Sequence, residues 1–296
     1  MSYIPRNIEG NSVRNSFEDL AMPAALNFSH GFEDTKCWDK KYVVNEDTGE
    51  YLGIVGHKFN CASHPDFYQR TWEAMTQVLP DHELDGARVT WNSAKWGAWS
   101  SMQVILPNSK YTIETDKQST EVAQRIICFH GIDGSCSNQV YFGAIDFFCT
   151  NGMISGQYDK IKRKNTTNFN LDKFVEELEQ KNVVFAEQMG RVQRMAETSL
   201  VGKYEQVEEV LKALMPERPA EKMLNLYNEE VINRGDNVFA LYSAMTNYAS
   251  YADDRNGFKM RASDNDNAPL TMWNREQTVS KWVSSPAFET LLSVAA

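Results

Sequence analysis

Three side chains that could perform acid–base or nucleophilic chemistry lie close together in the middle of the chain. Cys149 could act as a nucleophile with His130 or His57 as its base, and His130 with Asp133 could form an acid–base pair. Each has a structural alternative. Asp133 and Gly134 are residue types that tight turns use, and a thiol at a strand end behaves as a small buried apolar group. The pattern favours a structural corner over a catalytic centre.

A basic run follows this stretch and is the strongest indication of a partner. Residues 157–203 carry nine Lys and Arg against seven Asp and Glu, in a chain whose formal net charge is −10. Lys and Arg bind phosphates, Thr and Asn add hydrogen bonds, and aromatic rings stack on unpaired bases. A solvated connection between two helices is the alternative. The predicted nucleic-acid-binding residues are Lys160, Lys162, Arg163, Lys164, Thr166 and Asn168, with Tyr158 and Trp96 as stacking surfaces.

Trp91, Trp96 and Trp99 lie on one expected hairpin, with a turn at residues 95–98. Tryptophans so placed form either a platform for bases or part of the sheet core. Farther along, Asn151 and Gly152 stand at an expected helix start, where free backbone N–H groups can face an anion. The hairpin and this corner therefore each leave a binding and a structural interpretation open.

Metal and nucleotide chemistry find no support in the motifs. No two of the five histidines have the i, i+4 spacing of a helical zinc site, and the cysteines form no C-x-x-C pair. Neither G-x-x-x-x-G-K-[ST] nor G-x-G-x-x-G after a strand is present. We expect neither a metal nor a cofactor, and no nucleotide hydrolysis by the usual routes.

Composition indicates an ordinary globular chain, with 42% hydrophobic and 24% charged residues. The first fifteen residues lack the apolar core of a signal peptide, and no apolar run reaches the length of a membrane span. An odd cysteine count without a disulfide pattern predicts reduced thiols and a cytoplasmic location. The negative net charge argues against coating nucleic acid by bulk attraction, though it leaves room for a local basic groove.

The periodicities predict an α+β fold, with a mostly antiparallel sheet in the N-terminal half followed by a helical C-terminal half. We expect an irregular segment over 1–40, a sheet-rich core over 41–156 and a helical region packed on the sheet over 157–296. The expected strands are 42–44, 51–55, 87–94, 99–106, 111–115, 126–129 and 140–148. One helix is expected to start at 63–66. Further helices are expected over 171–197, 204–214, 219–234, 238–251, 275–282 and 286–294. We expect the helix 238–251 to be buried and residues 253–269 to form a loop.

The order of motifs over roughly residues 50–250 resembles the phage/plasmid-like protein family. The resemblance rests on residues 54–67, the strand 87–91, the turn of His130, Asp133 and Gly134, the corner of Cys149, Asn151 and Gly152, the basic run to Asn168, and the helix 238–248. Family members often place a histidine in the basic run, where this chain has Asn165. The resemblance implies a mobile-element protein in a bacterial cytoplasm.

In that setting, an antiparallel sheet followed by helices, with a basic run where the two meet, looks like the phage single-strand annealing proteins. Those proteins bind DNA as oligomeric rings without a cofactor. The leading hypothesis is therefore a phage protein that binds single-stranded DNA and promotes annealing or recombination, as a homo-oligomer. One alternative is an anti-defence protein whose acidic surface engages a host protein. Another is an enzyme using His130, Asp133 and Cys149, which requires those side chains to converge in a pocket.

Overall fold

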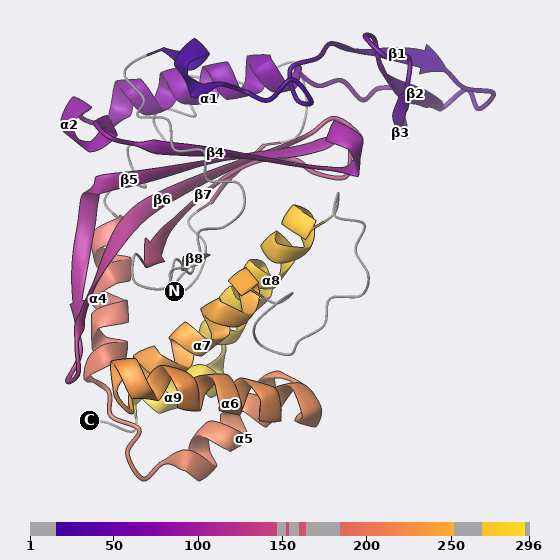
Figure 1. Cartoon of the computed structure of the whole chain (residues 1–296). Helices are drawn as coiled ribbons and strands as arrows, with labels where there is room; N and C mark the ends of the chain where they lie inside the picture. The colour runs from indigo at the N-terminus through magenta and orange to yellow at the C-terminus, as the bar shows by residue number, and fades with distance from the viewer. Residues whose placement is uncertain (1–15, 147–151, 154–159, 164–183, 252–267, 294–296) are drawn as a thin grey trace.

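The chain folds as antiparallel sheets in its N-terminal half and helices in its C-terminal half, which confirms the predicted α+β class. The structure is a computed structural model and describes residues 16–146, 152–153, 160–163, 184–251 and 268–293 (Figure 1). No helix among these residues is both long and apolar enough to cross a membrane.

A small three-stranded antiparallel sheet comes first. Its strands are β1 (His30–Asp34), β2 (Lys40–Asn45) and β3 (Tyr51–Gly56). The hairpin of β2 and β3 is the predicted one, whereas β1 lies in a segment expected to be irregular. The sequence of β1 is too polar to show strand alternation, and its pairing with β2, from His30 opposite Asn45 to Asp34 opposite Lys41, supplies the order.

The main sheet has six strands in the order β4-β5-β6-β7-β8, with β9 also paired to β7. Its strands are β4 (Arg88–Ala94), β5 (Trp99–Glu114), β6 (Ser119–Gly131), β7 (Asn138–Asp146), β8 (Gly152–Met153) and β9 (Lys160–Arg163). The two strands expected at 99–106 and 111–115 are one long strand, β5. Its register with β6 shifts between Leu106 and Lys110, because Pro107 cannot donate to the ladder and a bulge accommodates it.

Helices cover the main sheet on both faces (Figure 1). On one face lie the 3-10 helix η1 (Phe17–Leu20), α1 (His64–Val78) and α2 (Asp81–Leu84). Here Phe67, Trp72 and Met75 of α1 belong to the same buried cluster as Met102 and Ile126 of the sheet. Ser63 caps α1, since its hydroxyl accepts the N–H of Asp66 at 3.2 Å.

The other face carries the helical half. Its helices are α4 (Val184–Glu197), α5 (Tyr204–Leu214), α6 (Glu217–Arg234), α7 (Val238–Tyr251), α8 (Ala268–Val283) and α9 (Pro286–Ser293). The helix expected over 171–197 is described only from Val184, and α8 begins within the segment expected to be a loop. As predicted, α7 is buried: Phe239, Leu241 and Met245 are inaccessible to solvent.

Two buried arginines tie this half to the main sheet. The Nη2 of Arg234 donates to Oδ2 of Asp146 on β7 at 2.7 Å, and both side chains are 1% exposed. Arg125 on β6 makes two hydrogen bonds to Glu276 of α8, at 2.9 and 3.1 Å. These charge-assisted contacts fix the orientation of the helices on the sheet.

Candidate nucleic-acid interface

Strand register brings three separate segments to one end of the main sheet. Ala94 of β4 lies opposite Trp99 of β5, and Trp99 lies opposite Gly131 of β6. At the same end, Asn138 of β7 lies opposite Arg163 of β9. The β4–β5 turn, the β6–β7 loop and the end of β9 therefore lie side by side, and we refer to this region as the loop end. Figure 1 shows it next to the small sheet.

The β4–β5 turn holds Trp96 in an unusual backbone conformation. Lys95 and Trp96 have φ values of 54° and 52°, and Gly97 follows at 86°. Left-handed backbone costs a residue with a side chain roughly 1–2 kcal/mol, so it persists only where the surroundings impose it. Trp96 is 80% exposed. In contrast, Trp99 is buried and Trp91 packs edge-on against Tyr68 at 5.0 Å, so the core interpretation holds for these two alone.

The β6–β7 loop supports the turn from one side. Lys95 Nζ donates to Asp133 Oδ2 at 3.0 Å and to Ser135 Oγ at 2.7 Å. The backbone N–H of Ile132 donates to Ala98 O at 2.9 Å. Gly134, at φ 74°, lets the loop approach β3, because a Cβ there would lie 3.3 Å from Val55. Asp133 thus acts as the anchor of the turn.

A buried polar cluster supports the turn from beneath. His64 Nε2 donates to Gly97 O at 2.7 Å, so the acceptor nitrogen of the neutral ring is Nδ1. That Nδ1 lies 2.7 Å from Ser100 Oγ and 2.8 Å from His130 Nδ1. Tyr68 completes the cluster through its hydroxyl, 2.9 Å from Ser100 Oγ.

Burial keeps both histidines of this cluster neutral. Desolvation lowers the pKa of His64 to about 4 and the pKa of His130 well below its ordinary value. His130 also stacks on Phe67, with ring centroids 4.6 Å apart. Its Nε2 has no hydrogen-bond partner within the described part of the chain. His130 contacts His64 while Asp133 contacts Lys95, so the described contacts give these two residues separate supporting roles.

The described part of the basic run, Lys160–Arg163, forms strand β9, whereas the structural alternative considered for it was a solvated connection between two helices. Lys162 lies opposite Gln139 and Arg163 opposite Asn138 on β7, with Lys160 opposite Tyr141. Adjacent strands are about 4.8 Å apart, so three strand spacings place the end of β9 about 14 Å from β5. Of the other predicted binding residues, Lys164, Thr166, Asn168 and Tyr158 lie outside the described residues.

The corner after β7 differs from its predicted form. Gly152 was expected to open a helix. Instead, Gly152 and Met153 form strand β8, which pairs with Ile145 and Ala144 of β7. The edge of β7 has backbone donors and acceptors with which the returning chain can pair. The local sequence pattern gives no sign of this edge, so it could not predict a strand at Gly152. Cys149 and Asn151 lie outside the described residues, so the convergence of Cys149 with His130 and Asp133 stays a prediction.

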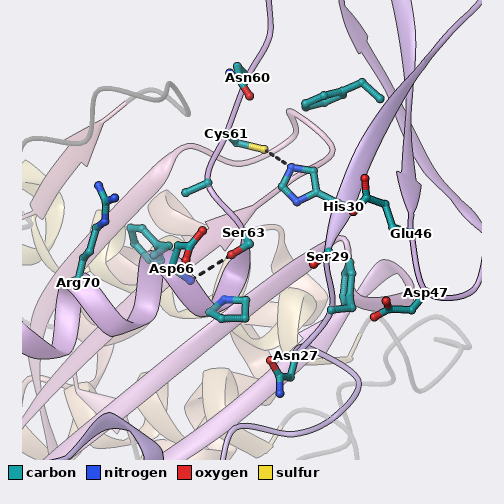
Figure 2. A pocket seen from close by; sticks show the side chains of 15 residues that line it. Asn27, Ser29, His30, Glu46, Asp47, Asn60, Cys61, Ser63, Asp66 and Arg70 are labelled. Carbon is teal, nitrogen blue, oxygen red and sulfur yellow. Dashed lines mark hydrogen bonds between the residues drawn. The ribbon is translucent and has the colours of Figure 1, made fainter.

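A pocket lies beside the loop end, between β1 and the start of α1, with a cavity volume of about 730 Å³. Figure 2 shows His30, Cys61, Asp66 and Arg70 around it, with Glu46 beside His30. Phe28 lines the pocket and also contacts Gly97, where a Cβ would lie 3.2 Å from its ring. Sequence reasoning missed this pocket; the only local signal was the predicted start of α1.

Metal binding finds no support in the described residues, which contain no group of three or more His, Cys, Asp or Glu arranged to hold an ion.

Comparison with known proteins matches the chain to a family: the family model of a domain of unknown function, DUF932, covers residues 84–287. That span includes the whole main sheet and most of the helical half. No curated protein and no solved structure matches the chain.

Proposed function

The chain belongs to the DUF932 family, and we propose that it binds single-stranded DNA at the loop end of the main sheet. The observation that carries this proposal is Trp96. Trp96 is 80% exposed and lies on a left-handed turn, and this turn is supported on two sides by Lys95–Asp133 and His64–Gly97. Strained residues held by their surroundings are typical of functional sites.

Trp96 supplies the stacking surface in this proposal. Base–aromatic stacking contributes about 1–3 kcal/mol per base, and it tolerates any sequence because every base has a flat face. A turn held by its surroundings also reduces the entropy cost of ordering the backbone around the ring when DNA binds. Duplex DNA keeps its bases stacked internally, so an exposed indole selects for single strands.

Strand β9 supplies the positive charge. Lys160, Lys162 and Arg163 belong to the strand at the edge of the sheet, about 14 Å from the β5 side of the turn. Binding through these residues releases counterions from the DNA and therefore weakens as salt rises. Because the chain as a whole has a formal net charge of −10, attraction between the protein and the DNA phosphates is limited to this local basic region.

The resemblance to phage and plasmid proteins sets the wider proposal. In it, the chain works in a bacterial cytoplasm, assembles with copies of itself and brings complementary single strands together. The supporting features are the predominantly antiparallel sheet with helices on it and the basic edge strand. Mixing labelled complementary oligonucleotides with and without the protein tests annealing, and mass photometry in the same mixture measures the oligomer.

The binding test is a fluorescence-anisotropy titration of a labelled oligonucleotide at two salt concentrations. Trp96→Ala is expected to weaken binding by about 5–150-fold, the equivalent of 1–3 kcal/mol. The matched control is Trp38→Ala, because Trp38 is 90% exposed but lies on the β1–β2 turn. Equal affinity of the Trp96 variant and the unaltered chain would overturn the stacking role.

The charge test compares two double variants that remove the same charge. Lys162→Ala with Arg163→Ala is expected to weaken binding and to reduce the slope of log affinity against log salt by about 1.4, at about 0.7 per phosphate contact on a single strand. Lys203→Ala with Lys212→Ala, in the helical half at the start of and within α5, is expected to leave that slope unchanged. Identical slopes for both variants, or no salt-dependent binding at all, would refute the proposal.

A further inference from the structure

The pocket beside β1 contains a thiol and an imidazole in contact. Cys61 Sγ lies 3.3 Å from His30 Nε2, within hydrogen-bonding reach. Figure 2 shows the two side chains pointing toward each other from different segments of the chain. Both line the cavity of about 730 Å³, a volume within the 300–1,000 Å³ typical of small-molecule sites.

We propose that Cys61 and His30 form a nucleophile and its base, and that the pocket takes a small acyl donor such as a thioester. A nucleophile within hydrogen-bond reach of a base, with a third group acting on the base, is the arrangement that covalent catalysis requires. This site is independent of the proposed DNA-binding surface, so either can fail without the other.

Protonation states suit this chemistry. Burial lowers the pKa of His30, so the imidazole is neutral and able to accept a proton near pH 7. Burial raises the pKa of the Cys61 thiol to about 12. The resting pair is therefore a neutral thiol beside a neutral base. Attack needs proton transfer to His30 in the same step, which is general-base catalysis.

Charged neighbours stabilise the proton on His30 once it has moved. The negative charges of Glu46 and Asp66 favour the protonated form of His30. The nearby buried histidines His64 and His130 are kept neutral by burial, which lowers their pKa values. Lys41 favours and Asp133 opposes the Cys61 thiolate. Glu46 lies against the backbone next to His30, since a Cβ on Gly31 would be 2.6 Å from its carboxylate.

The reaction balances without an oxidant or a reductant. Sγ of Cys61 attacks the carbonyl carbon of the thioester, and the thiol proton moves to His30 Nε2. The carbon–sulfur bond of the donor then breaks, and the donor's thiol leaves with that proton. The products are S-acylated Cys61 and a free thiol. Asn27 and Asn60 in the pocket lining offer amide N–H donors for a carbonyl oxygen.

The test is the rate at which phenyl thioacetate acetylates Cys61 in the intact chain, followed by peptide mass spectrometry. The exposed Cys37 is the internal reference. A thiol with a pKa of about 12 that reacted only as thiolate would be modified about 10³-fold more slowly than one of ordinary pKa. Its rate would also rise about tenfold per pH unit. With His30 as base, the Cys61 rate is expected to change less than about threefold between pH 7 and 8.5.

His30→Gln is expected to slow acetylation of Cys61 by about 10²-fold or more and to restore the tenfold rise per pH unit. Glu46→Gln is expected to slow it less, and Glu33→Gln, a change of the same charge on β1, to leave it unaltered. The pH profile of the unaltered chain needs no substitution, so a variant that fails to fold does not remove the test. A steep thiolate profile in the unaltered chain, or an unchanged rate in folded His30→Gln, overturns the proposal.

Discussion

Acidification is expected to destabilise the fold through His64 beneath the β4–β5 turn. Its folded pKa is about 4, against an ordinary value of about 6.5 in the unfolded chain. The unfolded chain therefore takes up the proton first as pH falls. The stability that neutral His64 provides is complete above pH 6.5 and is lost between that pH and about 4.

The magnitude follows from that difference. The difference between the folded and the unfolded pKa of His64 corresponds to about 3 kcal/mol, most of which is lost by pH 4.5. His130 acts in the same direction, because burial lowers its pKa as well. A loss of this size is a large part of the 5–15 kcal/mol that typically holds a domain together.

The assay is urea unfolding followed by tryptophan fluorescence near pH 7 and pH 4.5, in the unaltered chain and in His64→Gln. The variant is less stable at neutral pH, because it disturbs the hydrogen bonds to Gly97 and Ser100. On acidification the variant is expected to lose about 2–3 kcal/mol less than the unaltered chain. His82→Gln, at an exposed position on α2, is the matched control for a histidine in water. Equal losses in the unaltered chain and in His64→Gln would show that His64 is not held neutral by burial.

Other substitutions test the turn, the inter-half contact and the pocket. Trp96→Gly relieves the left-handed strain and is expected to raise the free energy of unfolding by about 0.5–1 kcal/mol, while single-stranded DNA binding measured by anisotropy falls. Asp146→Ala removes one of the two carboxylates that pair with buried Arg234, the other being Glu230, and is expected to cost about 1.5–3 kcal/mol in chemical denaturation; a loss below about 1 kcal/mol would contradict a stabilising buried ion pair. Gly31→Ala displaces the Glu46 carboxylate, and acetylation of Cys61 is expected to slow while the melting temperature changes little.

The general architecture could be predicted from the sequence because its signals are local. Short apolar, aromatic and β-branched runs separated by turn residues predicted the antiparallel strands, and the polar turn ending in Gly49 predicted the β2–β3 hairpin. Ser63 followed by Pro65 predicted the start of α1, and the apolar circumference of residues 238–251 predicted a buried helix. Each signal depends on neighbours within a few positions.

The sites depend on contacts between distant positions. The sequence gives no reason to treat Trp91, Trp96 and Trp99 differently, because all three lie on one expected hairpin. The left-handed turn exposes Trp96, whereas Trp99 lies in the core. His64 meets His130 across 66 positions. No periodicity reports such a pairing, because it depends on how α1 packs on the sheet.

The same reason explains the pocket and the edge strands. His30 and Cys61 are 31 positions apart and meet only because β1 joins the small sheet and the chain then returns to α1. The sequence alone determined that strands precede helices and that a basic run follows residue 156. Tertiary structure decided which tryptophan faces solvent, that the basic run begins as an edge strand, and which thiol has a base beside it, since burial and strand pairing assign those roles.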